Sequence, residues 1–200
     1  MTRDQDPDGL ITLPSGGPPD PKQVGTVRIE ARIAAGPVSR LYRGVDLTLG
    51  RTVVVKVLTA ETDTEVAGRF LDAAQKLTGL SHPHVVEVLG SGMEGTLPYA
   101  VLEFLEATDL DTASRHELTL VPAVAASVVL DAASGLKAAL GRGVLHGDVR
   151  PRHLLRHHGA TKVTGFGLSP AFLTAQGRRL RGHPAYVAPE VAQGGKPSVQ

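Results

Sequence analysis

Three short runs rich in β-branched residues follow one another between residues 27 and 58, with only turn-length connections between them. The runs read VRIEARI, SRLYRGVDL and RTVVVKVL, and the segments AAGP and LTLG lie where the chain must turn. Such short connections suit antiparallel neighbours, whereas a parallel pair needs a crossover of a dozen or more residues. The sequence therefore predicts an antiparallel meander at the start of the folded region.

Helical spacing of apolar residues predicts two helices further along the chain. The first follows Thr62 or Asp63, either of which can cap it, and ends at Gly79. The second runs from about residue 122 to residue 140. Between them, VVEVLGSG and PYAVLEFL return to strand. Five strands, a helix after the third, and a later helix make an α+β plan, with a cleft between its two halves as the natural ligand site.

Composition narrows the classes of protein to which the chain can belong. Residues 1–24 hold five Pro and four Asp with little apolar material, which predicts a disordered tail ahead of a domain over residues 25–200. The absence of Cys excludes disulfides, thiolate zinc sites and a cysteine nucleophile, and we expect a cytoplasmic location. The longest apolar stretch, residues 118–140, is broken by Pro122, Asp131 and Lys137, so no membrane-spanning segment is predicted.

Charge is distributed unevenly. Residues 1–141 hold 12 Lys and Arg against 18 Asp and Glu, whereas residues 142–200 hold 9 against 2. A cationic C-terminal third could attract phosphate, an acidic partner or nucleic acid, or could be balanced by acidic residues outside this chain. With no Trp, three Tyr and four Phe, stacking of single-stranded nucleic acid is not expected.

Four features carry potential chemistry, and each has a plain structural alternative. Lys56 lies in the apolar strand VVVKV, where a lone Lys usually marks the solvated face. The loop at residues 34–39 could bring backbone N–H groups to a phosphate or be an ordinary turn. His146-Gly147-Asp148 precedes a run of cations, so Asp148 could be an anchored carboxylate or a general base. Residues 165–167 read Gly-Phe-Gly, which alone means little, and no metal site is predicted.

Taken together and in this order, these segments resemble the bacterial eukaryotic-like, or Hanks-type, Ser/Thr protein kinase family. The resemblance rests on AAGPVSRLYRG, VVVK ending at Lys56, LSHPHVV, LPYAVLEFL, VLHGDVRP, GFG and the APE at residues 188–190. It implies a bilobal fold: a five-stranded antiparallel N-lobe sheet with one helix over residues 25–105, and a partial helical C-lobe over residues 106–200. The chain ends ten residues after the APE, so we expect the C-lobe to be incomplete.

The N-lobe departs from the family pattern at two places. The phosphate-covering loop of the family has three Gly, and this chain has Ala34, Gly36 and Ser39 in those places. Lys56 matches the strand lysine that holds the α- and β-phosphates. The helix Glu that pairs with that lysine lies nine residues before the His-Pro histidine, and counting back from His82 gives Ala73. The Lys–Glu pair is therefore expected to be absent.

The catalytic loop departs further. Asp148 keeps the position of the catalytic base, and Arg150 replaces the loop lysine. His153 replaces the Asn that ligates a metal ion, and Gly165 replaces the metal-binding Asp of the Asp-Phe-Gly motif. Mg²⁺ requires oxygen ligands, so Mg²⁺ binding is not expected. The resemblance therefore implies a pseudokinase, in which Asp148 and Arg150 occupy catalytic positions but do not catalyse phosphoryl transfer.

The resemblance also places a nucleotide cleft and an interior stack. Leu41 and Val54 would cover an adenine from above and Leu155 from below, while Glu103 and Leu105 would offer hinge backbone groups. With Lys56, Arg150 and His153 nearby, the cleft could bind ATP or another anion without metal, or be empty. The stack positions are filled by four residues, namely Leu77, Val88, His146 and Phe166.

Three functional hypotheses follow. The first is a catalytically inactive regulatory or scaffolding module in Ser/Thr kinase signalling, whose partner is an active kinase or a phosphopeptide-reading domain. The second is a weak or atypical ATP-dependent Ser/Thr kinase that uses Lys56 and Asp148. The third is binding of an anion or nucleic acid by the basic third of the chain, with nucleic acid the less expected ligand.

Overall fold

The computed structural model describes residues 20–36, 38–59, 64–115, 120–168, 171–173 and 179–195. Its main sheet has six strands, in the spatial order β1 (Gln23–Val24), β2 (Val27–Ala35), β3 (Ser39–Asp46), β4 (Arg51–Leu58), β6 (Leu97–Glu103) and β5 (Val88–Glu94). All neighbouring pairs are antiparallel. The predicted meander is confirmed as β2, β3 and β4, which begin at the predicted residues.

The sheet has one strand more than the predicted five. Strand β1 lies within the segment predicted as a tail, and it pairs with β2 through Val24 and Val27. Both valines are fully buried, because they pack with Tyr42 and Val53 beneath the sheet. A two-residue strand carries too little periodicity to be recognised in a sequence. Residues 1–19 of the predicted tail lie outside the described residues.

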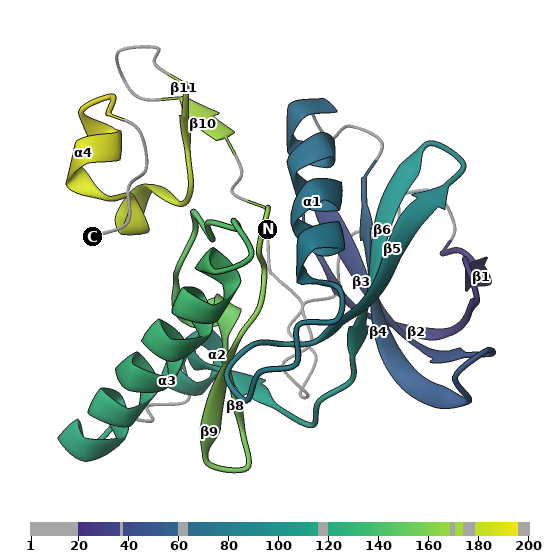
Figure 1. Ribbon diagram of the computed structural model, residues 1–200, viewed down its shortest axis with the longest axis horizontal. Coiled ribbons are helices and arrows are strands. Elements are labelled where there is room, and N and C mark those ends of the chain that lie inside the picture. Colours follow the sequence, from purple (N-terminus) through teal and green to yellow (C-terminus); the bar gives the residue numbers. More distant parts are fainter. Residues whose placement is uncertain are drawn as a thin grey trace, which may run out of the picture.

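Helix α1 (Thr64–Leu77) packs against the main sheet alongside β5 and β6 (Figure 1). Its buried residues recur at helical spacing: Val66, Phe70, Ala73, Ala74 and Leu77. Gly79 ends the turn that follows with a φ of 75°, which glycine adopts without a steric penalty. The predicted capping residues Thr62 and Asp63 lie outside the described residues.

The second lobe consists of α3 (Pro122–Leu140) and a three-stranded sheet of β7 (Thr108–Asp109), β8 (Leu154–His157) and β9 (Ala160–Val163). Helix α3 approaches the first lobe closely at Gly135, where an added Cβ would clash with the carbonyl oxygen of His84. The remaining elements are α2 (Leu110–Arg115), β10 (Ala171–Leu173), β11 (Arg179–Arg181), α4 (Pro189–Ala192) and the 3₁₀ turns η1 (Pro151–His153) and η2 (Pro184–Tyr186).

A single apolar core joins the two lobes. It brings Phe70 and Leu77 of α1 together with Ala132 of α3, Val163 of β9 and Phe166. A second cluster, on the opposite face of the main sheet, contains Tyr42, Val53 and Val55. The cleft between the lobes is thus backed by one continuous core.

Helix α3 is long and apolar enough to cross a membrane by length and composition, with a mean hydropathy of 1.5 and 22% of that window buried. In this fold its inner face contributes Val128, Ala132, Gly135 and Ala139 to the interior. A core helix of a soluble protein satisfies the same test of length and composition. The expectation that no segment spans a membrane stays a prediction.

Candidate nucleotide cleft and catalytic loop

Strand register places three predicted ligand-binding residues on one face of the main sheet. Leu41 lies directly opposite Lys56, and Val54 lies two residues before Lys56 on the same strand. Because side chains alternate along a strand, these three share a face. Val53, Val55 and Val57 point to the other face and are buried there. Leu41 and Val54, the apolar side chains predicted to cover an adenine, therefore lie on the same face as Lys56.

Lys56 is partly buried, and no carboxylate of the described residues forms an ion pair with it. Ala73 occupies the helix position of the missing glutamate and is itself buried. Burial, together with the positive charges of Arg152 and Arg150, lowers the pKa of Lys56 to about 8. Lys56 is thus a desolvated cation whose nearest charged groups are mostly cations.

The hinge carries its own ion pair. The Glu103 N–H donates to the Glu87 carbonyl at 3.0 Å, so this backbone donor is already used by a hydrogen bond within the protein. The Glu103 carboxylate accepts from Lys162 Nζ at 2.6 Å and from the Glu87 N–H at 2.8 Å. Leu105 is partly buried, and Leu155 lies on β8 opposite Lys162. These contacts tie the hinge to the second lobe.

The loop that corresponds to the phosphate-covering loop is a tight turn. Ala34 pairs with Leu41 in the β2–β3 ladder and is exposed. The Gly36 N–H donates to the Ser39 carbonyl at 2.9 Å, so it closes the turn. Pro37 lies outside the described residues. The Gly36 N–H is therefore not free to contact a phosphate.

His146 organises the catalytic loop from inside. Its Nε2–H donates to the Thr164 carbonyl at 2.8 Å, and its Nδ1 accepts the Asp148 N–H at 3.2 Å. Burial lowers its pKa to about 4, which keeps the ring neutral. Its ring centroid lies 4.6 Å from that of Phe166. The four residues of the predicted interior stack, Leu77, Val88, His146 and Phe166, are all buried.

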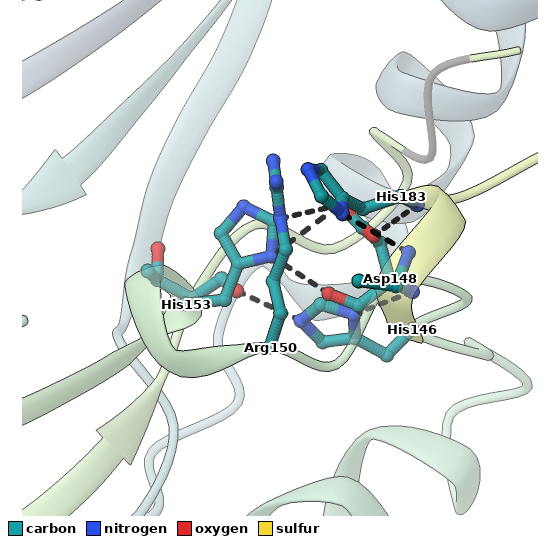
Figure 2. A network of polar contacts seen from close by, with 7 residues as sticks. His146, Asp148, Arg150, His153 and His183 are labelled. Carbon is teal, nitrogen blue, oxygen red and sulfur yellow. Dashed lines mark hydrogen bonds and ion pairs between the residues drawn. The ribbon is translucent and has the colours of Figure 1, made fainter. Parts of the chain in front are cut away.

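The Asp148 carboxylate is enclosed, as Figure 2 shows. Its side chain is only 1% exposed, and Oδ1 accepts the His183 N–H at 3.1 Å. Oδ2 lies 3.0 Å from Arg150 Nε, yet the two groups are not oriented for a hydrogen bond, and both atoms are buried without such a partner. Burial raises the pKa of Asp148 against the opposing effect of Arg150. The carboxylate therefore faces Arg150 and the His183 backbone N–H.

His153 and Gly165 occupy one space between them. The His153 Nδ1–H donates to the Asp148 carbonyl at 2.8 Å, which fixes the ring. A Cβ added to Gly165 would lie 2.8 Å from His153 Cδ2 and 3.0 Å from Nε2. Gly165 also has a φ of 88°, a conformation that residues with a Cβ rarely adopt. The histidine ring therefore fills the room that an aspartate at position 165 would need.

The Mg²⁺ that the kinase resemblance implies does not fit these residues. Gly165 has no side-chain oxygen, and burial lowers the pKa of His153 to about 3, leaving a neutral imidazole. Mg²⁺ prefers oxygen ligands in an octahedral arrangement. Asp148 is held by Arg150 and His183, and the described residues contain no group of three His, Cys, Asp or Glu that could hold a metal ion. The described residues at this site therefore do not fit a Mg²⁺ ion, and the expectation that the chain binds none stays a prediction.

Two cavities border the loop. A small one, of about 30 Å³, lies behind Lys56 between Phe70, Leu102 and Gly165 and is mostly apolar. A larger one, of about 450 Å³, is lined by α1, residues 143–149 and residues 186–191. Asp148 borders the larger cavity and Lys56 the smaller one. Lys56 and Asp148, the two residues that the hypothesis of an active kinase uses, thus border different cavities.

Comparison with known families identifies the family to which the chain belongs. The protein kinase domain model matches residues 27–199. The fold, the Lys56 strand and the His146-Gly147-Asp148 loop agree with that match. The chain belongs to the protein kinase domain family.

Its relatives include bacterial serine/threonine-protein kinases. PkaB of Streptomyces coelicolor is 37% identical over 157 residues, and PknK of Mycobacterium tuberculosis is 36% identical over 172 residues. These matches cover 71% and 83% of this chain but only 37% and 15% of the relatives. A probable serine/threonine-protein kinase of Bifidobacterium longum, PknA2, is 31% identical, and the match covers 24% of it. The chain thus spans well under half of these relatives.

A solved structure supports the fold. The PknI kinase domain of Mycobacterium tuberculosis superposes with a TM-score of 0.68, covering 87% of this chain and 68% of that domain at 20% identity. The predicted α+β, bilobal kinase-like fold is confirmed.

Sequence reasoning missed two contacts at the site. His183 donates its backbone N–H to Asp148 across 35 positions, and no local motif marks such a contact. The Lys162–Glu103 pair spans 59 positions and was also missed. Opposite charges on two predicted strands were the only available signal for that pair.

Proposed function

We propose that this kinase-family domain is catalytically inactive and acts by binding, as a regulatory or scaffolding module in Ser/Thr kinase signalling. The observation that carries the proposal is the interlock of His153 and Gly165, which removes both metal ligands of the kinase template and fills their space. Metal-ion charge stabilisation supplies several kcal/mol in such transition states, and each 1.36 kcal/mol is about tenfold in rate. Its loss is expected to reduce transfer by several orders of magnitude.

Two further features support inactivity. Lys56 has no carboxylate partner among the described residues, because Ala73 stands at the position of the helix glutamate. Asp148, the base position, is enclosed by Arg150 and the His183 N–H. A general base must reach the hydroxyl whose proton it accepts. We further propose that the domain binds an active kinase or a phosphopeptide-reading domain in the cytoplasm.

The alternative is a weak or atypical ATP-dependent Ser/Thr kinase that uses Lys56 and Asp148. Its support is that Lys56, the Asp148 position and the apolar cleft residues are all present, and that the relatives are serine/threonine-protein kinases. The two hypotheses differ in one measurable quantity, the rate of phosphoryl transfer.

The test is transfer of radiolabelled phosphate from ATP to the chain itself and to a generic basic protein substrate, with Mg²⁺ and separately with Mn²⁺. We expect no transfer above that of the Asp148→Asn variant. Transfer by the native chain that the Asp148→Asn variant loses, with both proteins folded by circular dichroism, would overturn the proposal and establish the alternative.

A further inference from the structure

The larger cavity, of about 450 Å³, is separate from the predicted nucleotide cleft. Residues 143–149 form its floor, and α1 and residues 186–191 form its walls. Its lining includes none of the side chains that were predicted to hold a nucleotide in the cleft, namely Leu41, Val54, Lys56 and Leu155. The volume falls within the roughly 300–1,000 Å³ of ligand-binding sites in proteins. This cavity is therefore a second candidate site.

Three large apolar side chains on the cavity lining are exposed to solvent. Leu145 is 49% exposed, Val149 is 41% exposed and Tyr186 is 50% exposed. The segment that leads to Tyr186 lies against the floor, because a Cβ added to Gly182 would lie 3.6 Å from the Gly147 carbonyl oxygen. Exposed apolar side chains gathered around a hollow are typical of interaction sites.

The floor also leaves backbone groups without partners. Within the described part of the chain, Leu145, Gly147 and Val149 form no hydrogen bond through N–H or C=O, and all three are exposed. The Asp148 N–H, by contrast, donates to His146 Nδ1 on the buried side. Gly147 bends the floor with a φ of 75°, so its groups offer separate hydrogen bonds rather than a regular ladder. A polypeptide brings matching donors and acceptors, whereas a hydrocarbon chain brings none.

One carboxylate of the cavity has no cationic partner. The lining side chains hold three carboxylates and one guanidinium, namely Asp72, Asp148, Glu190 and Arg69. The first two carboxylates are compensated from outside the lining, by Lys76 at 2.7 Å and by Arg150 at 3.0 Å. Glu190 forms no ion pair or side-chain hydrogen bond with any residue that the structure describes. A ligand with a positive charge opposite Glu190 complements this site.

We propose that this cavity is the docking site for the partner protein, and that it binds an extended segment in which basic and apolar residues alternate. A basic side chain pairs with Glu190, and apolar side chains pack on Leu145, Val149 and Tyr186. The backbone of the segment forms hydrogen bonds with the unpaired groups of the floor. The inference rests on the proposed function, because a domain that acts by binding needs a docking surface.

Charge disfavours the N-terminal segment of this chain as the occupant. Residues 1–19 do contain an apolar run, Leu10 to Leu13, but their charged residues are three Asp against one Arg. An acidic segment would bring like charge towards Glu190. The partner segment is therefore expected to come from another protein.

The test uses a blocked pentapeptide in which Leu and Arg alternate, labelled with a fluorophore, and the full chain. Fluorescence anisotropy measures binding. We expect saturable binding that weakens by about tenfold when Glu replaces Arg, when Ser replaces Leu, and when the backbone amides are N-methylated. No binding up to about 200 μM chain, or equal affinities for the Leu-Arg peptide and any of the three altered peptides, would overturn the inference.

Two variants with matched controls assign the peptide to the cavity. Tyr186→Ala is expected to weaken binding by about tenfold, because exposed aromatic residues are frequent anchors. Glu190→Gln is expected to weaken it by about threefold, and by less at high salt. The controls are Met93→Ala and Glu106→Gln, at exposed side chains outside the cavity lining, and both should bind as the native chain does. Unchanged affinity in both cavity variants would place the peptide elsewhere and overturn the inference.

Two measurements separate the other occupants. Light scattering should give the same mass for the native chain and for Tyr186→Ala. A dimer that Tyr186→Ala dissociates would assign the cavity to a second copy and overturn the inference. Leu13→Asp should leave the affinity for the Leu-Arg peptide unchanged. A higher affinity in this variant would mean that the N-terminal segment of the chain competes for the cavity, and would likewise overturn the inference.

Failure of this inference and failure of the proposed function are distinguishable. Peptide binding in the cavity together with measurable phosphoryl transfer would refute inactivity and leave the docking site standing. Absence of both peptide binding and transfer would refute the docking site and leave the domain inactive, as proposed.

Discussion

The sheet region, formed by β1–β6 and α1, and the loop region, residues 146–167, are held together by different interactions. In the sheet region, backbone ladders satisfy the polar groups and apolar side chains such as Phe70 and Tyr42 fill the interior. In the loop region, side chains of His146, Asp148 and His153 bind backbone groups directly. The stability of the first region should therefore respond to changes of side-chain volume, and that of the second to changes of pH and of local geometry.

The largest effect is expected in the sheet region. Phe70→Ala removes a side chain that is 3% exposed at the centre of the core joining both lobes. The free energy of unfolding should fall by about 3–5 kcal/mol, because a cavity is left in addition to the lost burial. Chemical denaturation measures this. Ile33→Ala, at a side chain 45% exposed, is the control and should change stability by less than about 0.5 kcal/mol. Equal losses in the two variants would refute the placement of α1.

The interlock of His153 and Gly165 should produce the largest effect in the loop region. Gly165→Ala should cost about 2–3 kcal/mol, since the new Cβ meets the His153 ring and the backbone φ is 88°. In a His153→Ala background the clash is gone, and only the backbone cost of about 1 kcal/mol should remain. Gly95→Ala is the matched control, because Gly95 has a φ of 58° and no atom within 4 Å of an added Cβ.

The coupling between these two positions is the quantity that decides the comparison. A double-mutant cycle by thermal or urea unfolding gives it directly, with an expected value of about 1 kcal/mol or more. Additive effects would mean that the His153 ring does not fill the space of position 165 and does not exclude a metal-ligating side chain there.

Acid should weaken the loop region before the sheet region. Burial lowers the pKa of His146 to about 4 and that of His153 to about 3, whereas both titrate near 6.5 once unfolded. Below pH 6.5 the unfolded chain therefore binds more protons, so stability falls as pH falls, by about 1 kcal/mol per pH unit for each histidine between about pH 6 and pH 4.

The His153→Asn variant isolates one of these histidines. The stability of the variant should decline less steeply with acid than that of the native chain, in urea titrations at several pH values. Asp148 is present in both proteins, so the difference in slope reports His153. The matched control is His158→Asn, at an exposed histidine, which should leave the slope unchanged. Parallel curves for the native chain and His153→Asn would contradict the buried neutral ring.

The same contrast explains what the sequence could predict. Strands β2 to β4 and helices α1 and α3 follow from periodicity, because their burial repeats along a few neighbouring residues. Lys56, Asp148, His153 and Gly165 were found because the motifs that contain them are local. β1, β7 and α2 were not predicted, since two to six residues carry little periodicity. The enclosure of Asp148 by His183 depends on tertiary packing, which no local pattern records.

The smallest effect on stability is expected for the Glu103–Lys162 ion pair, a polar contact at the hinge end of the sheet region. Glu103→Gln keeps an oxygen for the Glu87 N–H but removes the charge that pairs with Lys162, whose side chain is 18% exposed. A partly exposed pair contributes little, so the loss should be about 0.5–1 kcal/mol and should shrink at high salt. The control pair, Lys76–Asp72, is more exposed, and Asp72→Asn should cost less still. Urea unfolding at low and high salt measures both. A loss above about 2 kcal/mol at Glu103 would place the hinge with the loop region, as a segment held by polar contacts rather than by the sheet.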